Sequence, residues 1–375
     1  MKKYINQLDM KMANAADIFS LIRKRERITR KEIEAETGFS WGAVSTITAQ
    51  LIEKNYIREF KLKVKGGAGR IPSYLEVNGD DFFVLGVDIN ISGFKAVVLN
   101  LKNEAAESFC KKAVYTDCDS LLGEIINFVS DTLSSVKNKK IIGIGVAMQG
   151  LVDAKNGISV NIPHCRSWDN VPLSQILRDR FDIPVFIEHD PDCVLYSILA
   201  EDICKDAILF RVDEGIGMSV LLDGKIFNRQ GAFEVGHTVS VPDGVLCSCG
   251  KQGCLEAYAS ENGMARLAGK SFEKLVESAK SKDRESLRLF SDMAKYLAVA
   301  VSNMSNILCI DKIVLCGDMW KYKDLFYNEF LYNVKSLSGK TNMEFSFIDV
   351  ENAAIGAALI AIERSIKIID FGKDV

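Results

Sequence analysis

Three cysteines lie within eight residues of the chain, at positions 247, 249 and 254, with Gly250 and Gly253 between them. Glycines let so short a loop turn tightly enough to bring several sulfurs onto one ion. Together with His237, the single histidine just upstream, the thiols make a Cys₃His set that closes a tetrahedral site without a metal-bound water. A redox pair or three incidental thiols are the alternatives. The spacing favours one structural zinc per chain, with the ligands His237, Cys247, Cys249 and Cys254.

Basic and acidic residues are unevenly distributed along the chain. Residues 1–78 carry fifteen Lys plus Arg and nine Asp plus Glu, a net charge of +6, whereas the remainder has a net charge of −9. A basic segment ahead of a larger acidic body is typical of a polyanion-binding module joined to a second domain. An ordinary solvated face has the same composition, so the residue pattern within the segment has to decide.

That pattern predicts three helices between residues 14 and 57. Thr29 and Glu32 have the spacing of a capping box, in which each side chain satisfies a backbone N–H at the start of a helix. Gly38 then favours a left-handed turn, and Ser40 has the position of an N-cap for the third helix. Two short helices joined by such a turn are typical of a helix-turn-helix.

Residues 56–64 and 73–77 alternate like strands around a Gly-rich turn, which adds a wing. The third helix should pack through Val44, Ile47 and Leu51, with Thr48 off that face, and present its N-terminal part to base edges. The alternative is a three-helix oligomerisation unit with a basic surface. Further candidates for contacts with DNA phosphates are Arg23, Lys24, Arg25 and Arg27. The predicted DNA contacts are Arg30, Lys31, Ser40, Trp41, Ser45, Thr46, Gln50 and Arg70.

From residue 79 onward, buried strands alternate with helices, and polar residues follow the strand ends. A strand, a turn and a second strand are predicted at 82–101 and again at 207–227, and the strand at 183–189 leads into a helix. This alternation predicts a two-lobed α/β body. The expected domains are a winged helix-turn-helix at 1–78, a first lobe at 79–199 and a second lobe with the cysteine motif at 200–375.

Several short motifs in the body resemble the ROK family, which contains sugar kinases and sugar-responsive repressors. They are Glu-x-Gly-His at 234–237, Cys-x-Cys-Gly at 247–250, Gly-Cys-x-Glu at 253–256, Gly-Leu-Val-Asp at 150–153 and the segment 354–361. The resemblance covers essentially the whole body, and a winged helix ahead of it is similar to the repressor branch. It implies a two-lobed actin-like, ribonuclease-H-like sugar-kinase fold preceded by the winged helix-turn-helix domain.

The resemblance also implies a sugar or amino sugar bound between the lobes. In the family an Asn-Asp pair, a Glu, the motif His and a second Glu hold the sugar, and carboxylates suit this role because they accept strongly from hydroxyls. Here His189 stands where the family has Asn, which puts the identity of the sugar in doubt. Asp190 has a simple helix N-cap as its alternative role, and His164 is a weaker candidate. The implied sugar ligands are Gly150, His189, Asp190, Glu234, His237 and Glu256.

Phosphoryl transfer needs glycine-rich turns whose backbone N–H groups cradle phosphates. The kinases' first turn reads Asp88-Ile89-Asn90-Ile91-Ser92 here, and the second begins Asp213-Glu214, which brings two carboxylates to a place for polyanions. The third is Cys316-Gly317-Asp318 instead of a glycine run. We therefore expect that ATP binding is lost, that no residue is catalytic and that Asp190 is a vestigial general base.

The expected function is a sugar-responsive DNA-binding regulator, a repressor of carbohydrate-utilisation genes such as those of xylose metabolism. An operator with two-fold symmetry implies at least a homodimer, or a homotetramer. The alternatives are an ATP-dependent sugar kinase with an accessory head, and a sugar-blind regulator that binds another protein. No apolar run reaches the roughly 18 residues of a membrane span, and no secretory signal is evident, so a cytoplasmic protein is expected.

Overall fold

The computed structural model describes residues 7–61, 72–90, 93–113, 117–162, 165, 167–200, 204–227, 233–340, 342–348 and 352–368. It divides into two compact units that are interleaved along the chain, unlike the consecutive ranges expected for the lobes. The first unit comprises Met1–Ala147, Leu173–Ile187 and Ala357–Val375, and the second comprises Met148–Pro172 and Glu188–Gly356. No helix within the described residues has the length and apolar character of a membrane span.

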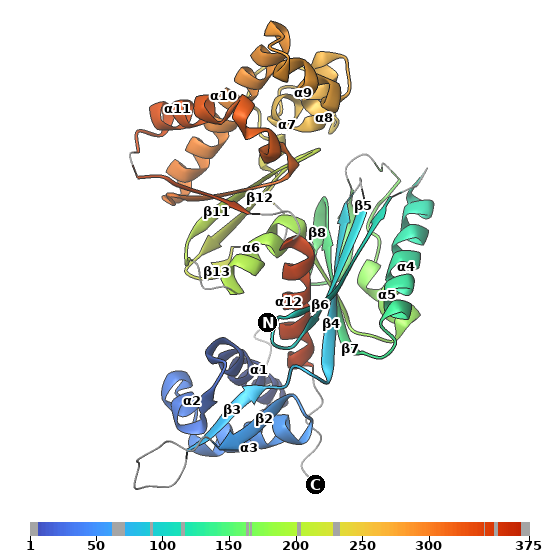
Figure 1. Ribbon diagram of the computed structural model, residues 1–375, viewed down its shortest axis with the longest axis vertical. Helices are drawn as coiled ribbons and strands as arrows, with labels where there is room; N and C mark the ends of the chain where they lie inside the picture. Colours follow the sequence, from blue (N-terminus) through green and yellow to red (C-terminus); the bar gives the residue numbers. More distant parts are fainter. Residues whose placement is uncertain are drawn as a thin grey trace. The chain divides into compact units, whose positions relative to one another are not determined.

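The N-terminal part of the first unit is a small helical head with a three-stranded sheet in the order β1-β3-β2 (Figure 1). The capping box at Thr29, the left-handed Gly38 with a φ of 70° and the N-cap Ser40 all form as the sequence predicts. β1 was not foreseen, because two residues carry no readable alternation. The head's elements are α1 (Gln7–Arg25), β1 (Ile28–Thr29), α2 (Arg30–Thr37), α3 (Trp41–Glu53), β2 (Ile57–Lys61) and β3 (Ser73–Val77).

α3 packs into the head through Val44, Ile47 and Leu51, as expected. The prediction that Thr48 lies off this face is wrong, because Thr48 is fully buried. Its hydroxyl donates to the carbonyl oxygen of Val44 at 2.8 Å and accepts from Nε of Arg30 at 2.8 Å. A β-branched side chain that returns its hydroxyl to the preceding turn can be buried without an unsatisfied polar group.

The rest of the first unit is a five-stranded sheet in the order β10-β7-β4-β5-β6. α12 lies on one side of it, and α4 and α5 lie on the other (Figure 1). Gly145 on β7 is needed there, since a Cβ would collide with the carbonyl oxygen of Ala357 on α12. The elements are β4 (Phe82–Asn90), β5 (Gly93–Asn100), β6 (Ala105–Lys112), α4 (Cys118–Ser135), β7 (Lys140–Met148), α5 (Leu173–Phe181), β10 (Val185–His189) and α12 (Asn352–Lys367).

The second unit contains a sheet in the order β13-β12-β11-β14-β15. Counted along the chain, both sheets place their strands in the order third, second, first, fourth, fifth, which confirms the repeated α/β arrangement of a two-lobed fold. The five strands of the second unit's sheet are β11 (Ala207–Val212), β12 (Ile216–Leu222), β13 (Lys225–Ile226), β14 (Lys312–Cys316) and β15 (Glu344–Ile348). β8 (Leu151–Asp153) and β9 (Ile158–Asn161) form a separate two-stranded sheet.

Helices cover this second sheet and form an extensive apolar core with β11, β12 and β14. Phe290 and Leu297 of α10 are fully buried in it. The helices are α6 (Asp190–Ala200), η1 (Val235–His237), α7 (Glu256–Ala259), α8 (Glu261–Ala268), α9 (Phe272–Lys280), α10 (Arg284–Leu308), η2 (Asp318–Leu325) and α11 (Tyr327–Ser338). Buried residues of β11 and β14 belong to this core, and Asp213 and Gly317 follow these two strands.

Candidate metal centre and effector site

The cysteine motif forms a compact loop between η1 and α7. Val239 pairs with Cys254 and Leu246 with Gln252 in isolated antiparallel bridges, which fold the loop back on itself. Gly253 has a φ of 79°, and a Cβ there would collide with the carbonyl oxygen of Val241. The loop therefore needs glycine at this position for two independent reasons, the backbone conformation and the space.

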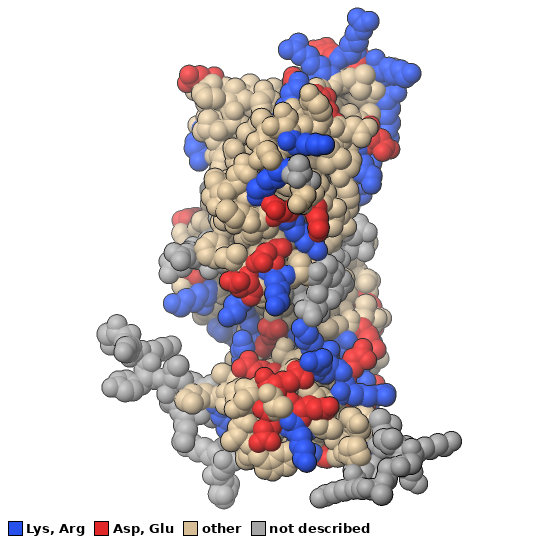
Figure 2. Space-filling model, turned by 90° about the vertical axis from the view of Figure 1, so that its left-hand side faces the viewer, with Lys and Arg blue, Asp and Glu red and all other residues tan. Residues whose placement is uncertain are grey.

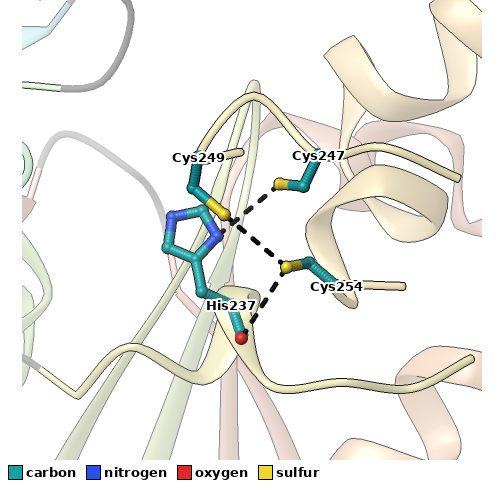
Figure 3. Close-up of side chains that lie close together, drawn as sticks. All are labelled: His237, Cys247, Cys249 and Cys254. Carbon is teal, nitrogen blue, oxygen red and sulfur yellow. Dashed lines mark hydrogen bonds between the residues drawn. The ribbon is translucent and has the colours of Figure 1, made fainter. Parts of the chain in front are cut away.

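The four predicted ligands converge in this loop (Figure 3). Sγ of Cys249 lies 3.7 Å from Sγ of Cys254, and Sγ of Cys247 lies 3.7 Å from Nδ1 of His237. All four ligand atoms lie within 4.8 Å of one another. A tetrahedral zinc with Zn–S bonds of about 2.3 Å separates its sulfurs by roughly 3.8 Å. The side chains thus have the separations that a four-coordinate metal requires.

The chemistry of the donor set agrees with this geometry. Cys254 is fully buried and Cys247 is 3% exposed. Burial, followed by the adjoining Cys249 thiol, raises the pKa of Cys254 to about 12. Without a cation this thiol keeps its proton at neutral pH, and a bound metal would displace the proton to form the thiolate ligand.

The metal loop leads directly into a predicted sugar ligand. Glu256 follows Cys254 by two residues, begins α7 and is 8% exposed. Its Oε2 accepts from the backbone N–H of Ile216 at 3.2 Å, and a Cβ on Gly215 would lie 2.9 Å from that oxygen. On the other side of the loop, Nε2 of His237 lies 3.8 Å from Oε2 of Glu234. With Nδ1 turned to the sulfurs, His237 keeps Nε2 on the side of Glu234.

Two further predicted ligands end β10 and begin α6. His189 and Asp190 are each 6% exposed, and Nε2 of His189 lies 3.6 Å from Oδ1 of Asp190. Burial, with a smaller effect of Arg211, lowers the pKa of His189 to about 3, so this imidazole is neutral. Nη1 of Arg211 donates to Oδ2 of Asp190 at 2.8 Å. Asp190 therefore pairs with a buried cation and is more than a helix cap.

The turns that correspond to the kinases' second and third phosphate turns form a negative region. Oδ1 of Asp213 accepts from the backbone N–H of Asp318, the first residue of η2. Burial, followed by the neighbouring Asp213 and Asp318 carboxylates, raises the pKa of Glu261 to about 8. Burial also raises the pKa of Glu214, again with Asp213 contributing. A field that keeps a carboxyl protonated at pH 7 disfavours polyphosphate at the same place.

The predicted DNA-contact residues lie mostly at the surface of the head. Trp41 has an exposed fraction of 48%, and Lys31, Ser40 and Thr46 are also exposed. Ser45 and Gln50 are half-buried. Arg30 already has partners, since its guanidinium donates to both Glu59 carboxylate oxygens at 2.7 and 3.0 Å.

Other arginines of the head are paired as well. Arg23 has a 9% exposed side chain 3.5 Å from Glu363 of α12, and Arg25 donates to Glu36 at 2.9 Å. On the face in Figure 2, Lys and Arg side chains are interspersed with Asp and Glu. Several cationic side chains of residues 1–78 are thus already engaged in local ion pairs.

Comparison with known proteins settles the family of the body. The sequence profile described as "ROK family" matches residues 84–364, about three quarters of the chain. The chain belongs to the ROK family.

Similar ROK proteins include regulators. The xylose repressor of Caldicellulosiruptor bescii is 25% identical over 351 residues, covering 86% of this chain and 87% of that protein. The xylose repressor of Bacillus spizizenii is 24% identical over 383 residues, covering 97% and 98%. Both alignments cover at least 86% of this chain, and the second covers nearly all of it.

Solved ROK structures share the fold. A ROK family transcriptional regulator, homologous to the Mlc protein of E. coli, superimposes with a TM-score of 0.80 at 21% identity, covering 96% of this chain and 97% of that one. A ROK family glucokinase from Streptomyces griseus, solved with glucose and AMPPNP, gives a TM-score of 0.65 at 19% identity, covering 74% and 99%. The actin-like two-lobed fold predicted from the motifs is therefore confirmed.

Arg211 contacts Asp190 in the candidate effector site, and the sequence motifs did not assign it. Arg211 occupies β11, whose other residues are apolar and buried, and an arginine in the run Ala-Ile-Leu-Phe-Arg-Val was the available signal. Gly150 lies in the turn before β8 with a φ of 85°. Arg70, Ile91, Ser92 and His164 lie outside the described residues.

Proposed function

We propose that this ROK protein is a sugar-responsive transcriptional regulator, a repressor of carbohydrate-utilisation genes. One observation carries the proposal. The chain joins a head with two capped helices around a glycine turn to a ROK body, and in that body the turn that binds phosphate in the kinases begins with Asp213 and Glu214. The repressor names of relatives that span head and body support it. The chain would act in the cytoplasm as a homodimer or homotetramer on a two-fold operator.

The sugar would bind through Asp190, Glu256 and the His237–Glu234 pair of the second unit. Asp190 and Glu256 are buried carboxylates, which accept hydrogen bonds from hydroxyl groups strongly. His189 and Gly150 complete the proposed set of sugar ligands. A neutral sugar or amino sugar suits this site better than a sugar phosphate. The carboxylates of Asp190, Asp213, Glu234 and Glu256 outnumber the single Arg211 guanidinium, so the surroundings carry a net negative charge.

A single structural zinc is proposed for His237, Cys247, Cys249 and Cys254. The metal would stabilise the loop and thereby fix the starting position of α7, which carries Glu256. It would supply no chemistry to a substrate, since four protein ligands close a tetrahedral shell. The loop thus links metal binding to the geometry of the sugar site.

DNA binding is proposed for residues 1–78, with the exposed side of α3 facing base edges. Trp41, Ser45, Thr46 and Gln50 would read bases there, and Ser40 and Lys31 would contact the backbone. Arg70 in the wing is retained as a proposed contact. Arg30 would have to leave Glu59 to reach a phosphate, so its contribution depends on a rearrangement in the complex.

The second candidate function is an ATP-dependent sugar kinase, favoured by the carboxylate of Asp190 at the position of the family's general base. The two functions are distinguished by measuring melting temperature and ATP turnover on the same zinc-loaded protein with D-xylose, D-glucose and N-acetyl-D-glucosamine.

A regulator should be stabilised by one of these sugars. At one hundred times its Kd a ligand adds ~2.7 kcal/mol, or roughly 5–10 °C for a domain of this size. Asp190→Asn should remove this shift, and no ADP should form. Sugar-dependent ADP formation that Asp190→Asn abolishes would establish the kinase and refute the regulator.

A further inference from the structure

Arg211 is a charged residue near the C-terminal end of the buried strand β11. Its side chain is 4% exposed, and every residue of β11 is buried. A charge in such a place costs several kcal/mol unless oppositely charged groups and hydrogen bonds compensate it. Two carboxylates do so here. Nη1 donates to Oδ2 of Asp190 at 2.8 Å, and Nε donates to Oδ2 of Asp213 at 2.7 Å.

The pairing decides the charge of Asp190. Burial raises the pKa of this carboxyl to about 6, Arg211 opposes the rise, and Asp213 adds to it. The guanidinium therefore favours the ionised form of this buried carboxyl. The other groups beside it do not replace that cation, because His189 is neutral and Asp192 on the same helix is hydrogen-bonded to Ser219.

The pairing also decides the orientation of Asp190. Oδ2 is held by Arg211, while Oδ1 is turned toward Nε2 of His189 at 3.6 Å, beyond ordinary hydrogen-bond distance. A hydroxyl group that donated to Oδ1 would find an ionised acceptor with a fixed lone-pair direction. Nδ1 of His189, which is buried, has no hydrogen-bond partner among the residues that the structure describes.

The opposite end of the guanidinium is fixed just as firmly. Asp213 uses its second oxygen to accept from the backbone N–H of Asp318 at the start of η2. The preceding residue, Gly317, has a φ of 113°, and a Cβ there would collide with the carbonyl oxygen of Val212. Arg211 thus cannot swing away from Asp190 without disturbing the tightly packed junction of β11 and η2.

We propose that Arg211 is a positioning residue of the effector site, whose buried guanidinium keeps Asp190 ionised and aimed to accept from a hydroxyl of an uncharged sugar. The inference deepens the proposed function and rests on it for the identity of the ligand class. It adds a residue that the sugar-binding motifs do not contain. The same guanidinium connects the effector carboxylate through Asp213 to the N-terminus of η2.

The test measures the pKa of Asp190 by carbon-13 NMR on zinc-loaded protein labelled at the aspartate carboxyl carbon. The variant Asp190→Asn assigns the signal, because it lacks this carboxyl group. Arg211→Gln should raise this pKa by about one unit or more, because an opposite charge at this distance lowers a carboxyl pKa by ~1–3 units. Arg211→Lys should stay near the wild type. Asp213→Asn should move the pKa downward, since it removes a neighbouring negative charge and keeps an acceptor for Nε.

Affinities for D-xylose, D-glucose and N-acetyl-D-glucosamine, measured by calorimetry from pH 5 to 8.5, supply the second readout. Binding by the wild type should weaken below about pH 6, and in Arg211→Gln the weakening should begin at a correspondingly higher pH.

An unchanged pKa of Asp190 in Arg211→Gln, or an unchanged pH profile, would overturn the inference. If no sugar binds the wild type, the proposed function fails, while the NMR titration still decides the role of Arg211. If Arg211→Gln does not fold, the role of Arg211 is decided by the pKa of Asp190 in Asp213→Asn, which should be lower than in the wild type.

Discussion

At the scale of single residues, the effector site depends on which side chains carry charge. His189 stays neutral because burial, with the nearby Arg211 cation, lowers its pKa to about 3. A neutral imidazole has one donor and one acceptor nitrogen, and an asparagine side chain offers a similar pair with a shorter reach. The replacement of the family's Asn by His189 therefore changes the shape of the site without changing its charge.

His189→Asn should consequently alter which sugar is preferred and leave the fold intact. We expect the ratio of affinities for D-xylose and N-acetyl-D-glucosamine to change about tenfold, equivalent to ~1.4 kcal/mol. Calorimetric titration of both sugars into the wild type and the variant measures that ratio. His189→Gln, which lengthens the amide, serves as the matched control. Equal ratios in all three proteins would show that His189 does not contact the sugar.

The sequence predicted individual residues well where a local pattern defined them. The capping box of Thr29 and Glu32 and the left-handed Gly38 follow from spacing alone. Thr48 was misplaced because helical periodicity does not reveal that its hydroxyl would bond the preceding turn. Arg211 was missed because its two partners, Asp190 and Asp213, come from different elements, so only the assembled sheet shows the pairing.

At the scale of elements, the loop between η1 and α7 is closed by backbone hydrogen bonds. They include the bond from the backbone N–H of Cys247 to the carbonyl of Lys251 at 2.7 Å and the bond from Gly253 to Val245 at 2.9 Å. Apolar support is small, consisting of Cys247, Cys254, Ala257 and Tyr258. A metal should therefore contribute a large share of the loop's stability.

Cys254→Ser should lower the metal content from about one zinc per chain to near zero. A loss of about 2 kcal/mol would lower the melting temperature by roughly 4–8 °C. Elemental analysis and differential scanning calorimetry measure both effects. Cys110→Ser is a suitable control, because Cys110 is an exposed thiol on β6. Equal zinc content in the wild type and in Cys254→Ser would refute the proposed metal site.

Elements with strong periodicity were predictable, whereas their pairing was only partly so. The strands β4, β5, β11 and β12 lie where the sequence indicates a strand, a turn and a second strand. The two-residue β1 was not evident, since its place in the sheet comes from pairing with β3. The arrangement of the four metal ligands was predictable because spacing and ligand chemistry restrict it more strongly than hydrophobic pattern restricts a strand.

At the scale of the whole molecule, α12 belongs to both compact units. At Gly356 it packs closely on α6, since a Cβ there would collide with the carbonyl oxygen of Cys193. Its later turns pack on β7, and Glu363 lies 3.5 Å from Arg23 of the head. Within the first unit, this helix therefore contacts both the five-stranded sheet and the head.

The central claim is that a sugar changes the affinity of the head for a specific DNA site. It is tested most directly by incubating fragmented genomic DNA with zinc-loaded protein, with and without D-xylose, D-glucose or N-acetyl-D-glucosamine, and sequencing the retained fragments. Trp41→Ala, at the exposed start of α3, is the control that should lose specific retention. We predict that one palindromic site is enriched and that one sugar changes its enrichment at least fivefold, within the ~1–3 kcal/mol typical of allosteric coupling. Absence of any enriched site under every condition would contradict the account.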